Sequence, residues 1–485
     1  MTLNFLSGEY YVDRVRSQTR YLQLLIAEQK RLLSPFGPNK FADVLEKITE
    51  AIGGFFDFEI KRVTLTNQSE VIDRSKKYLG LLETIHKNYL PFLEAVPEEF
   101  VPSEVLRCFT NFITTTNRKL GISTEFELRF FPAWVSNYGL HGYINFVQTL
   151  LKGFPTFLYS DPLKDIPTSP EWFIFITYPR IRPRDILLHP NMIHEIGHFV
   201  YHEMAVKPTT PLLKFDIKLH KISFEELLSK IKRELPRLSK DREMKLSEKI
   251  HTECARIVRN WLMEVFADLF AVRVIGPAYL FAFVELSTLV DVMDKYGDNH
   301  PSSTLRLRYL LKELRDLNYF RSKKKNSPLG KLSKFFSDWY KSIETKDLAP
   351  ILKDDKDPYF LVAYKTLEEN FSLIHSEIIK QIGQLHYSPE NINSKVYPLA
   401  KTLTTGTLPA EFWNKDNRLK EVAEFIDLLN AGWLTFFYEI EKFYRSVRAT
   451  TVPDKLDALD NFKQLLSKAI ESSEISRLWP SAGGP

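Results

Sequence analysis

Two histidines four residues apart, with a glutamate after the first, form the one stretch of this chain whose spacing implies chemistry. His194, Glu195 and His198 make the pattern His-Glu-x-x-His. On an α-helix, residues four apart lie on the same face, so both imidazoles can bind one metal ion. Glu195 is turned about a quarter-circle away and can reach a water molecule at the open position of the metal. Zinc suits this arrangement, because it accepts imidazole ligands in tetrahedral geometry and lowers the pKa of its bound water to about 7.

The third metal ligand is expected on a different helix. His202 follows the pattern on the same helix, eight residues after His194. That separation is about 12 Å along the helix axis, at a rise of about 1.5 Å per residue. A zinc ion with bonds of about 2.0 Å cannot collect both side chains.

Two carboxylates in an apolar segment are the candidates for that ligand. Glu264 and Asp268 are four residues apart, so they share one face of an expected helix over residues 240–274. Burying two carboxylates on such a face is costly unless they are paired or bind a metal. We expect Glu264 to bind the metal and Asp268 to accept a hydrogen bond from the second nitrogen of a ligand histidine. The alternative is an amphipathic helix that carries two solvated acids.

The order of the motifs resembles that of a known enzyme family. His300 and Pro301, with Arg306 six residues after the histidine, follow the two motifs above. This order is similar to that of the zinc metallopeptidases of the CAAX prenyl protease I and bacterial membrane heat-shock protease type, which are gluzincins. The resemblance covers roughly residues 170–310 and implies zinc bound by two histidines and one glutamate, here His194, His198 and Glu264. Those enzymes are typically membrane-embedded, whereas no spanning segment is expected here, so we predict a soluble relative.

Further roles are assigned on the same basis. Glu195 is the expected general base, which takes a proton from the metal-bound water and passes it to the leaving amine. His300, or a nearby tyrosine such as Tyr279, is a candidate for stabilising the oxyanion. For His300 the alternative is an ordinary histidine close to the start of the following helix. Arg306 is expected to pair with Asp268 or to bind substrate, and its alternative is an ordinary surface arginine.

The fold class predicted from these patterns is mainly α with a small β-sheet, as a gluzincin-like core flanked by helical regions. Apolar spacing predicts N-terminal helices, broken near residues 35–38 and 53–54, in a region that spans residues 1–120. The catalytic domain is expected over residues 121–320 and a C-terminal helical region over 331–478, with a basic linker at 321–330 between them. Expected strands are residues 124–130, 157–159 and 172–176, packed on the metal helix. An arginine-rich loop at 178–185 is expected to be solvated, or else to bind a substrate carboxylate.

Bulk composition narrows the function class. The chain has 485 residues, 44% of them hydrophobic, with a net charge of +5 and two cysteines. The mild charge does not indicate a nucleic-acid partner, and the few cysteines exclude a disulfide framework and fit a reducing compartment. The apolar stretch 275–293 carries two acidic residues and is expected to be a buried helix, not a membrane span. We therefore expect a cytoplasmic protein without a membrane span.

The sequence predicts a zinc-dependent metallopeptidase that hydrolyses a peptide or protein substrate. A first alternative is a non-catalytic zinc-containing scaffold whose helical flanks bind protein partners. Glu195 argues against this alternative, because a structural zinc site does not need a general base. A second alternative is a helical interaction protein in which the motif occurs by chance.

Overall fold

The structure is a computed structural model of residues 1–485, and it is mainly α-helical. It describes residues 7–33, 40–62, 67–90, 103–122, 126–133, 139–142, 172–179, 185–206, 218–234, 239–289, 293, 295–322, 326–344, 358–414 and 419–478. The chain divides into two compact units: the first comprises residues 1–100, 125–133 and 141–177, and the second comprises residues 101–124, 134–140 and 178–485. Residues on both sides of the predicted linker 321–330 belong to the second unit, so the three-part division stays a prediction.

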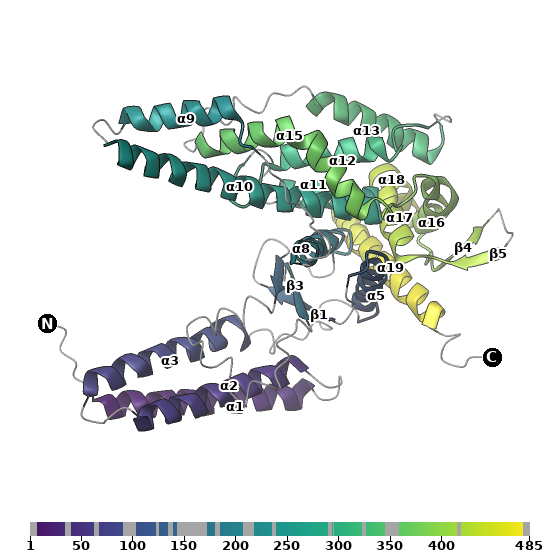
Figure 1. The fold of residues 1–485 in the computed structure, drawn as a ribbon. Coiled ribbons are helices and arrows are strands. Elements are labelled where there is room, and N and C mark those ends of the chain that lie inside the picture. Colours follow the sequence, from purple (N-terminus) through teal and green to yellow (C-terminus); the bar gives the residue numbers. More distant parts are fainter. Residues whose placement is uncertain are drawn as a thin grey trace. The chain divides into compact units, whose positions relative to one another are not determined.

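The first unit contains three helices that pack around a shared apolar core. They are α1 (Gly8–Leu33), α2 (Lys40–Arg62) and α3 (Gln68–Asn88), shown in purple and blue in Figure 1. The predicted break at residues 53–54 is wrong, because α2 continues through both glycines. A Cβ atom at Gly53 would lie 2.9 Å from Cγ2 of Thr19 on α1. The glycine therefore permits close helix packing, and this is why it occurs inside a helix that it would otherwise weaken.

Three short strands lie between residues 126 and 179 and form a small sheet. They are β1 (Phe126–Ala133), β2 (Gly139–Gly142) and β3 (Trp172–Pro179), which pair in the order β1-β3-β2. The expected strands 124–130 and 172–176 overlap β1 and β3, whereas the expected strand 157–159 lies outside the described residues. Packing of this sheet on the metal helix stays a prediction.

The second unit is built largely from helices of varied length. Its elements are α5 (Ser103–Lys119), α8 (Asn191–Val206), α9 (Lys221–Glu234), α10 (Lys240–Ile275), α11 (Pro277–Leu289), α12 (Ser303–Asp316), α13 (Pro328–Glu344), α15 (Pro358–Ile382), the π-helix η4 (Ile392–Val396), α16 (Tyr397–Thr404), β4 (Glu411–Asn414), β5 (Leu419–Val422), α17 (Phe425–Tyr438), α18 (Ile440–Ser446) and α19 (Val452–Leu478). Strands β4 and β5 are antiparallel, with Glu411 opposite Val422. Helix α17 packs against α11, α16 and α19, and α19 in turn packs against α5.

Helix α10 is the central element of this unit, and it confirms the helix predicted at residues 240–274 (Figure 1). It packs against α8, α9, α11, α12 and α15. From Val265 to its end every residue of α10 is buried, including Asp268 and Arg273. The helix stops at Gly276, whose φ of 73° is a conformation that favours glycine, and Pro277 begins α11. This turn places the start of α11 beside the buried end of α10.

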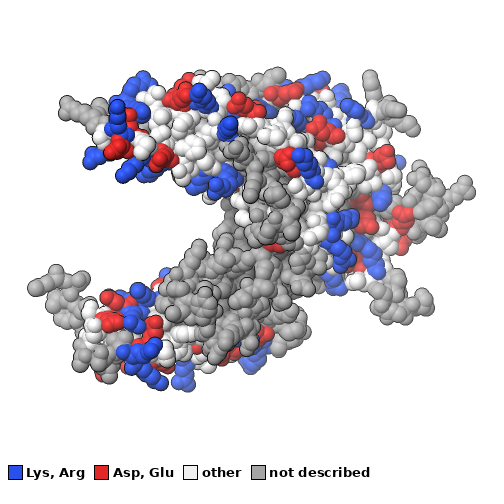
Figure 2. Space-filling model, viewed as in Figure 1, with Lys and Arg blue, Asp and Glu red and all other residues white. Residues whose placement is uncertain are grey.

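The helices and the surface charges of the described residues bear on whether the chain meets a membrane or a charged partner. None of the helices in the described part of the chain is both long enough and apolar enough to cross a membrane. The apolar stretch 275–293 instead contains α11, most of which is buried inside the unit. On the face drawn in Figure 2, lysine and arginine side chains alternate with aspartate and glutamate side chains over α9 and the start of α10.

Candidate metal centre

The two motif helices cross at a very short distance. Gly197 lies between the two histidines on α8, and a Cβ atom on it would be 2.7 Å from the Cα atom of Ala267 on α10. Any larger residue at position 197 would push against backbone that cannot move away by a side-chain rotation. The glycine and the alanine therefore let α8 approach α10 closely enough for His194 and His198 to reach the side chain of Glu264.

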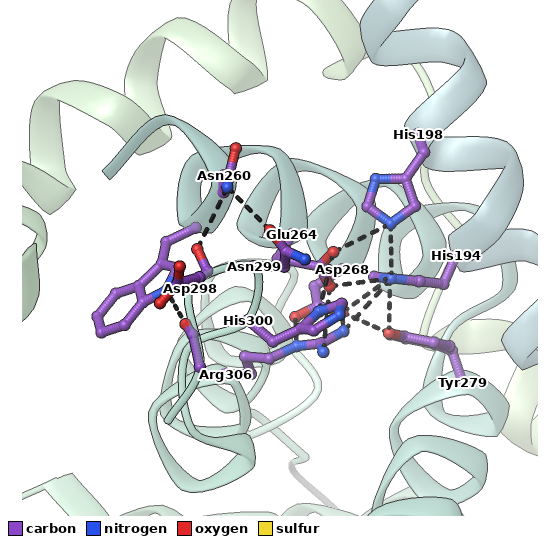
Figure 3. Close-up of polar contacts among 12 residues, drawn as sticks. His194, His198, Asn260, Glu264, Asp268, Tyr279, Asp298, Asn299, His300 and Arg306 are labelled. Carbon is purple, nitrogen blue, oxygen red and sulfur yellow. Dashed lines mark hydrogen bonds and ion pairs between the residues drawn. The ribbon is translucent and has the colours of Figure 1, made fainter. Parts of the chain in front are cut away.

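Three ligand atoms meet at this crossing, as Figure 3 shows. Nε2 of His194 is 3.1 Å from Nε2 of His198. The carboxylate of Glu264 spans both rings, with Oε2 3.3 Å from His194 Nε2 and Oε1 3.3 Å from His198 Nε2. All three residues are buried, with at most 9% of each exposed. The structure thus brings together the three residues predicted as metal ligands.

The spacing of these atoms fits a small tetrahedral ion. Bonds of about 2.0–2.2 Å to a tetrahedral metal place neighbouring ligand atoms about 3.3–3.6 Å apart. The observed separations of 3.1–3.3 Å are close to that range. Two imidazole nitrogens and one carboxylate are also the donor set that borderline ions such as zinc accept.

Asp268 holds the outer nitrogen of His194, as the sequence predicted. Its Oδ1 lies 3.0 Å from Nδ1 of His194. Arg306, from the first turn of α12, donates from Nε to Oδ2 and from the guanidinium to Oδ1 of the same carboxylate, each at 2.7 Å. Another guanidinium nitrogen lies 3.2 Å from Oε2 of Glu264. Arg306 is therefore paired with both acids, which disfavours its interpretation as an ordinary surface residue.

Buried charges shift the ionisation of this cluster. Burial raises the pKa of Asp268, but the charge of Arg306 outweighs it and lowers the pKa to about 2. Burial likewise raises the pKa of Glu264, and the charges of His198 and Arg306 bring it well below its usual range. Burial lowers the pKa of His194, yet its hydrogen bond with Asp268 and the neighbouring Glu264 raise the pKa to about 9. Both acids are therefore ionised, and Arg306 and the protonated His194 balance their charges in the metal-free cluster. A metal ion would take the place of a proton on His194.

Glu195 lies at an open cavity next to the ligand atoms. One of its oxygen atoms and one nitrogen of each motif histidine all lie within 4.8 Å of one another. Unlike the histidines it is only half-buried, and it lines a cavity of 720 Å³ between α8, α10, α11 and the start of α12. The carboxylate of Glu195 therefore lies both beside the candidate ligand atoms and at the wall of this cavity.

His300 approaches the site from a loop that is fastened to α10. Its Nδ1 lies 3.1 Å from Oε1 of Glu264, while 62% of its side chain is exposed. The indole of Trp261 donates to the backbone oxygen of Gly297 at 2.8 Å, and the amide of Asn260 donates to the next residue's backbone at 3.2 Å. Asn260 lies four residues and Trp261 three residues before Glu264, so both anchors come from the face of α10 that carries Glu264. Figure 3 shows Asn260 on this helix, beside the loop residues Asp298 and Asn299. His300 therefore has a fixed position at the cavity, where it is also among the lining residues.

The hydroxyl group of Tyr279 lies beside Nδ1 of His194, whereas an oxyanion donor is expected on the side of the ligand atom Nε2. Its hydroxyl group donates to Oδ1 of Asp268 and lies 3.1 Å from Nδ1 of His194. The ligand atom Nε2 is on the opposite side of that ring, facing Glu264. Tyr279 is fully buried, and its hydroxyl group is engaged on the outer side of the centre. Tyr279 and His300 both line the cavity, and the oxyanion role stays a prediction, for which the exposed His300 is the better placed of the two.

Other residues that the sequence drew attention to do not join the ligand atoms. His202 lines the cavity but is exposed, in agreement with the helix geometry that excluded it as a ligand. The arginines at positions 180, 182 and 184 lie outside the described residues. A second group of three, Glu313, Asp316 and His375, also has closely spaced ligand atoms. Glu313 accepts hydrogen bonds from both Arg273 and His375, so its charge is already compensated.

Sequence reasoning missed three contributors to the centre. Gly197 sets the helix crossing, and Asn260 and Trp261 anchor the loop that carries His300. For Asn260 a signal was present, because it lies four residues before Glu264 and eight before Asp268 and so shares their helix face. The role of Gly197 depends on which residue of another helix faces it, and no local pattern contains that information.

Comparisons with known proteins give no relative for this arrangement. The chain matches no model of a protein family, no curated protein and no solved structure. The resemblance to gluzincins therefore rests on the motifs and on the geometry of the centre, not on similarity along the chain.

Proposed function

We propose that this protein is a zinc-dependent metallopeptidase that hydrolyses peptide bonds. The observation that carries the proposal is the buried triangle of His194 Nε2, His198 Nε2 and a Glu264 carboxylate, with a half-buried Glu195 beside it on an open cavity. A purely structural zinc site is closed by four protein ligands, whereas a catalytic site keeps one position open. Three converging ligands next to a cavity favour the catalytic type.

Each residue then has a definite task. Zinc bound by the three ligands would polarise the scissile carbonyl group and lower the pKa of a bound water molecule. Glu195 accepts the proton of that water and delivers it to the leaving amine. His300 is oriented through its Nδ1 by Glu264, which leaves its other ring nitrogen available to a developing oxyanion. Asp268 and Arg306 keep His194 in place and keep the surrounding charges paired.

The first test is metal content, measured by elemental analysis of the purified full-length chain. We expect about one zinc ion per chain in the wild type and its loss in Glu264→Ala, since one of three ligands is removed. Glu253→Ala is the matched control, because Glu253 is on the same helix but is bound to Arg256 on the surface. Absence of zinc from the wild type would contradict the proposal and would favour a helical interaction protein with a chance motif.

The second test separates an enzyme from a metal-binding scaffold. Wild type and Glu195→Gln are incubated with a diverse peptide library, and cleavage products are identified by mass spectrometry. Removal of a general base typically costs about 10²–10⁴-fold in rate, so Glu195→Gln should be nearly inactive while its zinc content is unchanged. If both forms bind zinc and neither cleaves any peptide, the peptidase proposal is wrong, and the scaffold alternative with partner-binding helical flanks takes its place.

A further inference from the structure

We infer that Tyr279 is a positioning residue of the metal centre, which fixes the ring of His194 by acting through Asp268. Tyr279 is fully buried, and its hydroxyl group contacts both Asp268 and the outer nitrogen of His194 (Figure 3). The inference rests on the proposed metal centre, but it does not require that the centre be a peptidase.

The backbone that carries Tyr279 is itself held firmly. Asn430, on α17, accepts a hydrogen bond from the backbone N–H of Ala278 at 3.0 Å. The amide of the same side chain donates to the backbone oxygen of Ile275 at 2.8 Å. Asn430 thus bridges the end of α10 and the start of α11 across the turn at Gly276. This clamp determines where the Tyr279 hydroxyl group lies relative to Asp268.

The hydrogen bonds select one tautomer of His194. For Nε2 to offer its lone pair to a metal, the ring proton must be on Nδ1. That proton points to Oδ1 of Asp268, 3.0 Å away, and Tyr279 gives its own proton to the same oxygen, so its lone pairs also face Nδ1. With the proton on Nε2 instead, the Nδ1 lone pair would face a carboxylate and the phenolic oxygen. Tyr279 therefore disfavours the tautomer that cannot bind metal.

Arg306 completes the arrangement on the other side of the carboxylate. Its two hydrogen bonds and those from Tyr279 and His194 give Asp268 four donors in all. A carboxylate held from several directions has little freedom to rotate. The ring of His194 is then oriented before the metal arrives, which reduces the conformational entropy that binding must overcome.

Tyr279→Phe tests this inference, because it removes one hydroxyl group without changing the ring. The matched control is Tyr387→Phe, since the buried hydroxyl group of Tyr387 donates to the buried carboxylate of Asp427 in the same way. Zinc affinity of the full-length chain is measured by competition with a chromogenic chelator. Outer-sphere changes typically weaken metal binding about 10–100-fold. We expect a loss in that range for Tyr279→Phe and wild-type affinity for Tyr387→Phe.

A double-mutant cycle tests whether Tyr279 acts through Asp268. In an Asp268→Asn background, the further change Tyr279→Phe should have little effect on zinc affinity, because the group that it orients has already been altered. Cobalt substitution adds a spectroscopic readout: the visible d–d bands report ligand geometry, and they should shift in Tyr279→Phe but not in Tyr387→Phe. If Tyr279 had only a structural role, Tyr279→Phe would lower zinc affinity equally in the wild-type and Asp268→Asn backgrounds. It would also change the cobalt spectrum no more than Tyr387→Phe does.

Several outcomes would overturn the inference. Wild-type zinc affinity and an unchanged cobalt spectrum in Tyr279→Phe would do so, as would equal losses in the two tyrosine variants. If Tyr279→Phe does not fold, a rapidly exchanging Tyr279 hydroxyl proton in NMR spectra of the zinc-loaded wild type would contradict it.

Zinc binding that depends on Tyr279 without any peptide cleavage would refute the proposed peptidase and leave this inference intact. Failure of the wild type to bind any metal would refute both.

Discussion

Two buried aspartates in the second unit receive the same hydrogen bond and behave in opposite ways. Asp268 accepts from the hydroxyl group of Tyr279, and Asp427 accepts from that of Tyr387. Each aspartate is 1% exposed. Yet the pKa of Asp268 is lowered to about 2, because the charge of Arg306 outweighs burial, whereas burial raises the pKa of Asp427 to about 6.

The difference comes from the cation beside each carboxylate. Arg306 makes two hydrogen bonds with Asp268, but Lys395 comes no closer than 3.8 Å to Asp427. Oδ2 of Asp427 has no hydrogen-bond partner among the described residues. A tyrosine hydroxyl group alone therefore leaves the pKa of a buried aspartate above its ordinary value, whereas a bidentate arginine brings it below that value. The candidate metal centre needs the charged form, because Asp268 must accept a hydrogen bond from Nδ1 of His194.

The largest expected effect is the loss of the arginine. In chelator-treated protein, Arg306→Ala leaves Asp268 and Glu264 without their cation and should lower the free energy of unfolding by about 3–5 kcal/mol. Lys395→Ala is the counterpart at Asp427 and should cost less than about 1 kcal/mol, since Lys395 is partly exposed and distant. Urea unfolding followed by tryptophan fluorescence measures both. Equal losses would show that the two carboxylates depend on their cations to the same degree.

A smaller effect should appear between pH 4 and pH 8, and in that range only at the second aspartate, because the lowered pKa of Asp268 affects stability below about pH 4. With a pKa of about 6 in the folded chain and 3.8 as the ordinary value, Asp427 binds more protons when folded. Stability that it contributes is therefore fully present below pH 4 and is lost as the pH rises through 6, by up to about 3 kcal/mol at about 1.4 kcal/mol per pKa unit. Asp427→Asn should be the more stable protein at pH 8, and this advantage should disappear at pH 4. Thermal unfolding at both pH values measures the difference, and an advantage that persists at pH 4 would contradict the assignment.

The smallest effect concerns the glycine contacts of the two regions. Gly197→Ala places a methyl group against the backbone of Ala267, and we expect it to cost about 1–3 kcal/mol and to weaken zinc binding. Gly432, on α17, is the counterpart: an added Cβ atom there would meet the ends of two buried side chains, those of Leu466 and Leu187. Gly432→Ala should therefore also cost about 1–3 kcal/mol, but it should leave zinc binding unchanged, because these contacts lie outside the crossing of α8 and α10. Chemical denaturation and zinc titration of both variants provide the measurement.

Local periodicity was enough to predict part of this molecule. The spacing of His194 and His198 follows from helix geometry alone, and the same geometry excluded His202. The helix that carries Glu264 was also predictable, because its apolar pattern extends over many turns. Features within one helix are fixed by residues close in sequence, and these are the features that sequence patterns describe well.

Features that depend on contacts between helices were beyond that reasoning. The position of Tyr279 depends on the turn at Gly276 and on Asn430, which lies more than 150 residues further along the chain. The predicted break at Gly53 failed for the same reason, because the glycine accommodates Thr19 on a neighbouring helix. A glycine in a sequence can indicate either a turn or a place where two helices pack closely. Which of the two applies depends on the residues of the neighbouring element that face the glycine.

The backbone contact between Gly197 and Ala267 also bears on which ions the centre accepts. Because backbone meets backbone there, α8 and α10 cannot come closer together by repacking side chains, which sets a lower limit on the spacing of the three donor atoms. Calcium prefers bonds of about 2.3–2.6 Å and six to eight oxygen ligands, which two imidazoles and one carboxylate at this spacing do not offer. We therefore expect the proposed centre to take up zinc or cobalt in preference to calcium. In that proposal, a residue that has no side chain and never touches the ion contributes to the selection among cations.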